Sequence, residues 1–300
     1  SCCNTKNVPM RTNINNINNQ NYGGTMIKCT YLIKENNATK IIHYNYSFGL
    51  YEIIENEEIA LKVKIWNNNK KENLVSRKRF DKLGLNTIYF IIEGKIINDM
   101  SYMFHKCSSL KQIQFISPEI QKVTDMERMF QLCEELEYID FSNFDTTNVT
   151  NMLALFNECH KLKQIIGINK FNTINVKTME GMFQACNELE YLDLSNFNTA
   201  NVTNMGFMFN ECYKLKQIIG INKFNTIKVT NMEGMFGFCK ELEYLDLSSF
   251  NTVNVTNIRT IFNECYKLKH IIGINKFNTI NFTDMEGMFQ LCVELEYLDL

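Results

Sequence analysis

The stretch V-T-N-M-E-G-M-F-G-F-C-K-E-L-E-Y-L-D-L, residues 229–247, changes its hydrophobic rhythm halfway along. In its first part the apolar residues recur at intervals of three and four positions: Met232, Met235, Phe236, Cys239 and Leu242. This spacing is typical of one face of a helix, whereas the alternation of polar and apolar residues over 244–247 is typical of a strand. We therefore predict a short helix followed by a short strand.

The same pattern recurs along the chain at a nearly constant period. Its phenylalanine occupies eight positions, in steps of 26, 26, 27, 26, 27, 26 and 27 residues: Phe104, Phe130, Phe156, Phe183, Phe209, Phe236, Phe262 and Phe289. A period of this length indicates a solenoid, in which each repeat forms one coil. The units, numbered 1 to 8 below, begin near Ile97, Val123, Val149, Val176, Val202, Val229, Val255 and Phe282, and the last is incomplete.

Two kinds of unit alternate from unit 2 onwards. Units 2, 4, 6 and 8 carry E-L-E-Y before the strand and are called Glu units. Units 3, 5 and 7 carry K-L-K, followed by I-I-G-I-N-K-F-N-T, and are called Lys units. A pair spans 53 residues, which indicates that a two-unit block was duplicated.

A capping box marks the start of the predicted helix in several units. In T-N-M-E (230–233) and T-D-M-E (124–127 and 283–286), a threonine is followed three residues later by a glutamate, a pair that satisfies free N–H groups at a helix N-terminus. Unit 4 has Lys177 at the cap position, where the signal is weaker. The sequence thus predicts an α/β repeat solenoid, with a short helix and a short parallel strand in each coil.

A single unit cannot bury its own apolar face, but stacked units cover one another. We therefore expect a continuous core whose stability rises with the number of units. A second apolar column lies five residues before each unit start and is expected to stack as an internal spine: Phe144, Phe171, Phe197, Phe224, Phe250 and Phe277. Unit 1 has Pro118 at this position, as expected for an atypical terminal repeat.

The motifs D-M-S-Y-M-F-H-K-C-S-S-L (99–110) and S-N-F-D-T-T-N-V-T-N-M (142–152) resemble those of the BspA-like leucine-rich-repeat surface proteins. That family includes mycoplasma lipoproteins and expanded protist sets. The resemblance covers about residues 97–300, where the M-F-x-x-C core, the L-x-x-L-x-L strand and the N-V-T loop recur in register. It implies a leucine-rich-repeat-like solenoid and a role in adhesion or recognition at the cell surface or outside the cell.

The chain divides into three predicted regions. Residues 1–24 are polar and rich in asparagine, and we expect them to form a flexible segment. Residues 25–96 contain strand-like runs such as M-I-K-C-T-Y-L-I and N-T-I-Y-F-I-I, which predict a small β-rich domain. Residues 97–300 form the repeats. We expect the β-rich domain to cover the strand edge and apolar end of the first coil, because a solenoid requires such a cap.

The repeat cysteines occupy one position, three residues after the phenylalanine: Cys107, Cys133, Cys159, Cys186, Cys212, Cys239, Cys265 and Cys292. Disulfides or a metal site would need closer sulfur atoms or more ligands per coil, so we interpret these residues as small buried groups. Cys2, Cys3 and Cys29 stay undecided. Scattered histidines and the lack of a phosphate-loop, H-E-x-x-H or EF-hand motif predict no catalytic residues, metal or cofactor, and a protein that is not an enzyme.

Charge and hydropathy narrow the range of partners. With 31 basic and 33 acidic residues the net charge is −2, so the positive field expected of a nucleic-acid-binding protein is missing. No run reaches the roughly 18 apolar residues that a membrane-spanning helix needs. Because the chain begins at Ser1 and stops at Leu300 inside a repeat, we expect it to be a piece of a longer protein.

A column of alternating charge precedes the predicted strands: Lys111, Glu137, Lys163, Glu190, Lys216, Glu243, Lys269 and Glu296. When parallel strands stack about 4.8 Å apart, this column brings opposite charges together. A shift by one coil would oppose like charges, so we interpret the column as a structural device that favours one register.

The outward positions of the predicted strands form the candidate ligand-binding site, on the concave face of the solenoid. They hold tyrosine and aspartate in the Glu units, and glutamine and isoleucine in the Lys units: Tyr138, Asp140, Tyr191, Asp193, Tyr244, Asp246, Tyr297, Asp299, Gln164, Ile166, Gln217 and Ile219. Tyrosine suits a binding surface because it offers a large contact area at little entropic cost. The alternative explanation is the strand propensity of tyrosine and isoleucine.

These observations favour a non-enzymatic recognition or adhesion module that binds a protein or glycan ligand at the cell surface or outside the cell. The alternative is a cytoplasmic scaffold that uses the same surface, because unpaired cysteines suit a reducing compartment. Six asparagines match the glycosylation motif: Asn37, Asn45, Asn148, Asn201, Asn254 and Asn281. In the repeats we attribute this match to the loop and cap roles of the same residues.

Overall fold

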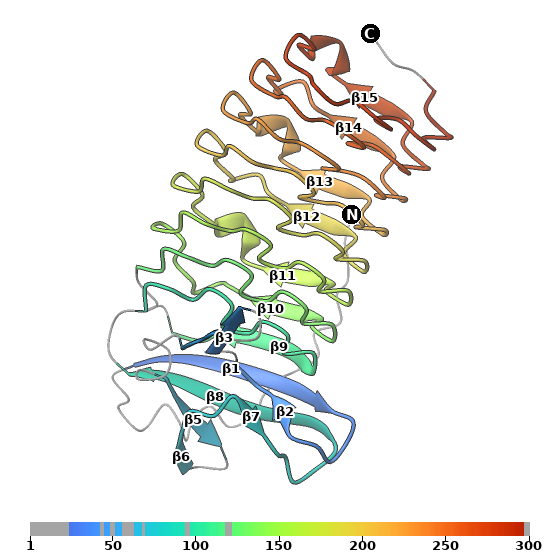
Figure 1. Cartoon of the computed structure of the whole chain (residues 1–300). Coiled ribbons are helices and arrows are strands. Elements are labelled where there is room, and N and C mark those ends of the chain that lie inside the picture. Colours follow the sequence, from blue (N-terminus) through green and yellow to red (C-terminus); the bar gives the residue numbers. More distant parts are fainter. Residues whose placement is uncertain are drawn as a thin grey trace, which may run out of the picture.

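The computed structural model describes residues 24–42, 45–48, 52–55, 63–67, 70–93, 97–117 and 122–296. The Asn-rich segment up to residue 23, Pro118, Tyr297 and Asp299 lie outside the described residues. In Figure 1 the repeats form a row of stacked coils that continues from a β-sheet built by the N-terminal part of the chain.

Short strands dominate the described chain. Before the repeats lie β1 (Gly24–Ile33), β2 (Thr39–Lys40), β3 (Asn45–Phe48), β4 (Glu52–Glu55), β5 (Val63–Asn67), β6 (Lys70–Asn73), β7 (Arg77–Lys78) and β8 (Gly84–Glu93). The repeats contribute β9 (Leu110–Phe115), β10 (Tyr138–Asp140), β11 (Gln164–Ile166), β12 (Tyr191–Asp193), β13 (Gln217–Ile219), β14 (Tyr244–Asp246) and β15 (His270–Ile272).

Helical structure is confined, within the described ranges, to a short 3-10 turn after the strand of each Lys unit: η1 (Ile168–Lys170), η2 (Ile221–Lys223) and η3 (Ile274–Lys276). None of the described helices has the length and hydropathy needed to cross a bilayer.

The N-terminal strands and the first coils share one sheet. Its strand order is β11-β10-β9-β1-β8-β5-β6, in which β1 is antiparallel to both β8 and β9, whereas β9, β10 and β11 are parallel. β1 therefore satisfies the backbone N–H and C=O groups at the edge of β9 that the first coil would otherwise expose. Phe90 of β8 packs against Phe104 of unit 1 with ring centroids 5.9 Å apart, so the core also continues into this sheet.

The predicted repeat solenoid is confirmed. Isolated parallel bridges join one position in successive units, from Asp99 and Asp125 to Asn257 and Asp284. The inward Met or Ile, Phe, Cys and Leu side chains of units 1 to 7 are buried. The repeat phenylalanine rings stack with centroids 5.4 to 5.8 Å apart, a favourable aromatic geometry. The apolar stripe of each of units 1 to 7 is thus kept from water by its neighbours, whereas Met285 of unit 8 is 51% exposed.

The predicted helix in each unit is wrong, and the fold is a β-solenoid rather than an α/β one. The stretch runs as a chain of turns in which the residues two before and two after the phenylalanine have positive φ, such as Gly234 (φ 57°) and Phe238 (φ 61°). Met235 N–H donates to Met232 O at 3.2 Å and closes a turn whose third residue is left-handed. A helix would instead need a bond to the carbonyl four residues back.

The N–H groups between these turn bonds donate to the next unit. Gly234 N–H donates to Arg259 O at 2.8 Å, and Phe236 N–H to Ile261 O at 2.9 Å. Backbone donors therefore alternate between bonds within a turn and bonds between units. Such a chain returns an apolar residue to the core at intervals of three and four, as a helix does, so the hydrophobic spacing does not separate the two structures.

The threonine of the expected capping box has a different role. Thr230 Oγ1 donates to Thr203 O of the preceding unit at 3.3 Å, whereas Asn231 Oδ1 accepts the N–H of Glu233 at 3.0 Å. The Asn or Asp after the threonine therefore closes the first turn, as in an Asx-turn. The threonine adds a hydrogen bond between units.

Strand pairing follows the two-unit repeat. β10 pairs with β11, β12 with β13 and β14 with β15, whereas among the described strands no pairing joins β11 to β12 or β13 to β14. At these unpaired boundaries the second phenylalanine column stacks instead, Phe171 on Phe197 (6.3 Å) and Phe224 on Phe250 (6.5 Å). This column is buried from Phe144 to Phe250, as expected of a spine. Strand bonds and ring stacking therefore alternate along the axis.

Each repeat cysteine after unit 1 is a hydrogen-bond donor in the core. Cys212 Sγ lies 3.1 Å from Phe183 O, and the same contact recurs from Cys133 to Cys292 at 3.0 to 3.3 Å. The cysteines of the described residues are free thiols, and the same residues contain no group of three or more potential metal ligands. Their interpretation as buried groups is confirmed from Cys107 to Cys265, with a directional bond that was not predicted.

These buried thiols are expected to react slowly in the folded chain. Burial raises the pKa of Cys107 and Cys212 to about 12 and the pKa of the half-buried Cys292 to about 11. Because the thiolate is the reactive form, iodoacetamide should label Cys292 first and the other repeat cysteines only after unfolding. Peptide mass spectrometry of chains labelled before and after denaturation tests this. Rapid labelling of Cys212 in the folded chain would contradict it.

The glycine of each Lys unit allows two units to approach closely. Gly220 has φ 88°, and a Cβ there would lie 2.5 Å from Ser195 Cα of the preceding unit. Gly84 has φ 90° but no atom within 4 Å of such a Cβ, which makes it a matched control.

We expect Gly220→Ala to lower the free energy of unfolding by about 2 kcal/mol more than Gly84→Ala. Both substitutions strain a left-handed backbone, but only the first forces two units apart. Urea unfolding followed by circular dichroism measures both variants. Equal losses would mean that the close approach of Gly220 to Ser195 does not contribute to stability.

Candidate functional site

The candidate site is the strand face, defined here as the outward side chains of β10 to β15. Parallel pairing places the tyrosine of a Glu unit beside the glutamine or histidine of the next Lys unit, and the aspartate beside the isoleucine. The paired residues are Tyr138 with Gln164, Asp140 with Ile166, Tyr191 with Gln217, Asp193 with Ile219, Tyr244 with His270 and Asp246 with Ile272. Of the predicted site residues, Tyr297 and Asp299 are outside the described residues.

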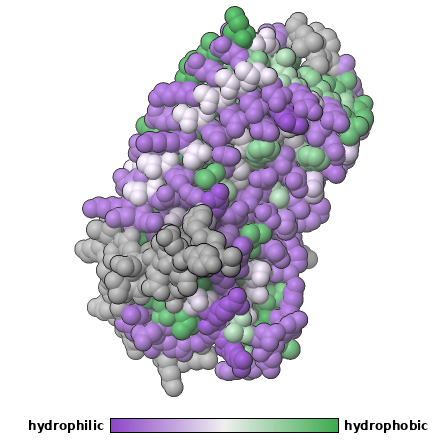
Figure 2. Space-filling view, viewed as in Figure 1, coloured by the Kyte–Doolittle hydropathy of each residue, from purple (hydrophilic) through white to green (hydrophobic). Residues whose placement is uncertain are grey.

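The tyrosine and isoleucine side chains of this face are exposed, as strand alternation predicts. Tyr191 is 58% exposed and Tyr244 is 50% exposed, while Ile166 and Ile219 are 42% and 45% exposed. The polar residues between them prevent a continuous apolar patch. Figure 2 shows that most of the coil surface on the side in view is hydrophilic, with the broadest hydrophobic area at the end of the solenoid away from the N-terminal sheet.

The aspartates of the strand face are bound within the solenoid. Asp193 Oδ1 accepts the backbone N–H of Ser195 at 3.0 Å, and its Oδ2 accepts Asn169 Nδ2 of the preceding unit at 3.2 Å. The side-chain hydrogen bond from Ser195 lowers the pKa of Asp193, because it stabilises the carboxylate. The aspartates therefore join the turn to the neighbouring unit, whereas the tyrosine and isoleucine side chains of the face are exposed.

Two columns of ion pairs border the strand face. The predicted column is confirmed from Lys111 to Lys216 by pairs such as Lys216 with Glu190 at 2.7 Å. Lys269 instead lies 3.7 Å from Glu294, outside the predicted column. A second column, which the prediction missed, lies on the other side of the buried leucine and pairs Lys214 with Glu188 at 2.7 Å. The E-L-E and K-L-K triplets indicate both columns, because each triplet has one charged residue on either side of the buried leucine. Exposed pairs of this kind stabilise by only about 0.2–1 kcal/mol each, so we attribute to them the register rather than the stability.

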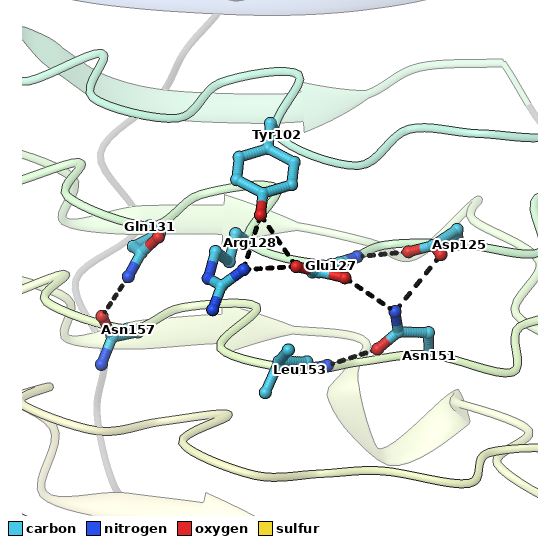
Figure 3. Close-up of polar contacts among 8 residues, drawn as sticks. All are labelled: Tyr102, Asp125, Glu127, Arg128, Gln131, Asn151, Leu153 and Asn157. Carbon is cyan, nitrogen blue, oxygen red and sulfur yellow. Dashed lines mark hydrogen bonds and ion pairs between the residues drawn. The ribbon is translucent and has the colours of Figure 1, made fainter. Parts of the chain in front are cut away.

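A polar network across units 1 to 3 was not predicted (Figure 3). Tyr102 OH donates to Glu127 Oε1 at 2.8 Å, and Arg128 Nη1 donates to both of these groups. Asn151 Nδ2 donates to Asp125 Oδ2 at 3.2 Å and to Glu127 Oε2 at 3.1 Å. Burial raises the pKa of Asp125. The E-R pair at 127–128 occurs only in unit 2 and could have marked this site, which we interpret as a link between units.

A pocket of about 460 Å³ lies on the strand face at β14 and β15. Tyr244 and His270 line it together with Ile272 and Lys276. His270 Nε2 lies 3.8 Å from a carboxylate oxygen of Glu296. Two further described histidines of the repeats, His105 and His160, belong to units 1 and 3 and do not line this pocket.

Comparison with known proteins assigns the repeats to a family. A family model described as "Mycoplasma protein of unknown function, DUF285" matches residues 98–219 and 186–297. The two matches together span 200 of the 300 residues, which is residues 98 to 297. No curated protein and no solved structure matches the chain. Since the family model matches two thirds of the sequence and its matches overlap within the solenoid, the chain belongs to this repeat family of unknown function.

Proposed function

We propose that the chain is a non-enzymatic recognition module that binds a protein or glycan ligand through the strand face. The observation that carries this proposal is the row of exposed tyrosine and isoleucine side chains, such as Tyr191 and Ile219, on hydrogen-bonded strands. A protein is the ligand class that we favour, because tyrosine and isolated aliphatic contacts within a polar surround are typical of protein interfaces.

Rigidity of the strand face supports the proposal. The strands that carry Tyr191 and Gln217 are fixed by parallel pairing, and Lys216 Nζ lies 5.9 Å from the Tyr191 ring centroid in a cation–π contact. A ligand that binds pre-ordered side chains loses little conformational entropy in the protein, which favours affinity.

The resemblance to BspA-like leucine-rich-repeat surface proteins supports adhesion at the cell surface as the setting of this recognition. The second candidate is an intracellular scaffold that uses the same face. It is favoured by the free thiols of the described cysteines, because unpaired cysteines suit a reducing compartment.

The strand-face tyrosines are expected to dominate ligand capture. Replacing Tyr191 and Tyr244 together with alanine should weaken capture of surface-extract proteins by the immobilised chain at least about tenfold, because buried tyrosines are frequent hot spots of interfaces. The melting temperature should stay nearly unchanged, since both side chains are half-exposed in the free chain. Quantitative pull-down and differential scanning calorimetry measure the two effects.

A matched control removes two tyrosines from the turn side. The hydroxyl groups of Tyr213 and Tyr266 donate to Glu211 at 2.9 Å and Glu264 at 2.7 Å, and neither residue belongs to the strand face. Alanine at both positions should leave capture unchanged. If the two double variants lost capture equally, or if the strand-face variant lost thermal stability in proportion to capture, the strand face would be structural.

A further inference from the structure

A second surface runs along the coils where each unit begins. The residues on either side of the buried valine point outward there and form two columns, called the Asn/Thr edge below. The column before the valine position is Lys122, Asn148, Asn175, Asn201, Lys228, Asn254 and Asn281, and the column after it is Thr124, Thr150, Lys177, Thr203, Thr230, Thr256 and Thr283. No position of either column carries an acidic residue.

Hydrogen bonds between units fix the backbone of this edge. Lys177 N–H donates to Thr150 O at 2.8 Å, and Thr203 N–H donates to Lys177 O at 2.9 Å. Thr203 Oγ1 donates to Lys177 O as well (3.2 Å), and Asn201 Nδ2 donates to Ile174 O (2.8 Å). The side-chain amide and hydroxyl oxygens of the Asn/Thr edge can therefore accept hydrogen bonds from a ligand. The main donors of the edge are the lysine ammonium groups.

Two open pockets lie along this edge. One, of about 460 Å³, is lined by Asn98, Lys122, Thr124, Asn148, Thr150 and Asn175. The other, of about 490 Å³, is lined by Thr150, Asn175, Lys177, Asn201, Thr203 and Lys228. Because they share Thr150 and Asn175, the two pockets form one groove parallel to the solenoid axis. Its lining carries positive charge and no negative charge.

The lysines of the groove differ from those beside the strand face. There, each lysine of the two ion-pair columns has a glutamate partner, as Lys214 has Glu188 at 2.7 Å. In the described part of the chain no ion pair involves Lys122 or Lys177, and Lys228 Nζ donates to the neutral Asn201 Oδ1 at 2.7 Å. An anion bound in the groove would therefore not have to displace a carboxylate.

From this geometry we propose that the groove of the Asn/Thr edge binds an acidic glycan, a sulfated or carboxylated sugar chain that lies along the solenoid axis. Lys177 and Lys228 bind its anionic groups, and sugar hydroxyls donate to the asparagine and threonine oxygens. Parallel coils repeat about every 4.8 Å, a length close to one sugar residue of an extended chain, so successive units meet successive sugars. This site is separate from the strand face and does not depend on the function proposed for it.

The groove suits a glycan better than a nucleic acid or a single small anion. Single-stranded nucleic acids are bound through aromatic side chains on which bases stack, and no aromatic residue lines either pocket. A small oxyanion is usually held by several free backbone N–H groups, but here the N–H groups of Lys177 and Thr203 are bonded between units.

The internal repeat supplies substitutions that remove charge without altering the coil. Threonine occupies the position of Lys177 in units 2, 3 and 5 to 8, and asparagine occupies the position of Lys228 in most units. In the full chain, the double variant K177T/K228N should bind a short heparin oligosaccharide at least about tenfold more weakly by isothermal titration calorimetry at low salt. Its affinity should also depend less on salt, because fewer counterions are released on binding. Its melting temperature should equal that of the original chain.

A control variant, K170Q/K223Q, removes two lysines of the 3-10 turns and should change the affinity less than about twofold. The single variants K177T and K228N provide the same test if the double variant folds poorly. The proposal fails if the original chain does not bind the oligosaccharide, or if the control weakens binding as much as K177T/K228N does. It also fails if a neutral oligosaccharide of the same length, or a single-stranded RNA of equal charge, binds as tightly as the heparin oligosaccharide.

Discussion

The solenoid depends on hydrogen bonds that join the same position in successive units. On the turn side alternate backbone N–H groups donate to the next unit, and threonine hydroxyls and cysteine thiols donate to carbonyl groups of the preceding one. A buried polar group without a partner costs about 1–3 kcal/mol, so an isolated unit could not keep these groups away from water. The fold is therefore cooperative between neighbours, and the antiparallel pairing of β1 with β9 extends the same bonding to the first coil.

Comparison among the units of this chain distinguishes positions that hold the same residue in each unit from positions where the residue differs. A threonine is buried in every complete unit from 2 to 6, because its hydroxyl bonds the next unit twice: Thr146 Oγ1 donates to Asn172 O (3.1 Å) and accepts the N–H of Asn172 (2.8 Å). The outward strand position has no such bond and holds tyrosine, glutamine or histidine. The buried threonine with its two bonds to the next unit is therefore the same in these units, whereas the first outward strand position differs from one unit to the next.

The columns of the repeat could be predicted from the sequence, and the local backbone could not. Burial of Phe236 and Cys239 and the pairing of Lys216 with Glu190 follow from period and charge alone. The prediction of a helix failed because a chain of turns places apolar residues at the same intervals as a helix does. Glycines within the predicted helix, such as Gly234 and Gly237, argue against a helix. The thiol bond of Cys212 and the groove at Lys177 both depend on how close a neighbouring unit lies, which no single unit encodes.

The two-unit block sets how often an exposed tyrosine occurs along the solenoid axis. The extra glycine of each Lys unit, such as Gly220, lets that unit lie directly on the preceding Glu unit and pair with its strand, while the next boundary is joined by Phe224 and Phe250. Exposed tyrosines therefore recur at every second coil. Lysines replace asparagine or threonine at irregular intervals along the Asn/Thr edge. The backbone hydrogen bonds between units are still formed at these positions, as at Lys177. The backbone bonds between units do not involve the side chains of Tyr191 or Lys177, so these side chains can be replaced without loss of the bonds that hold the coils together.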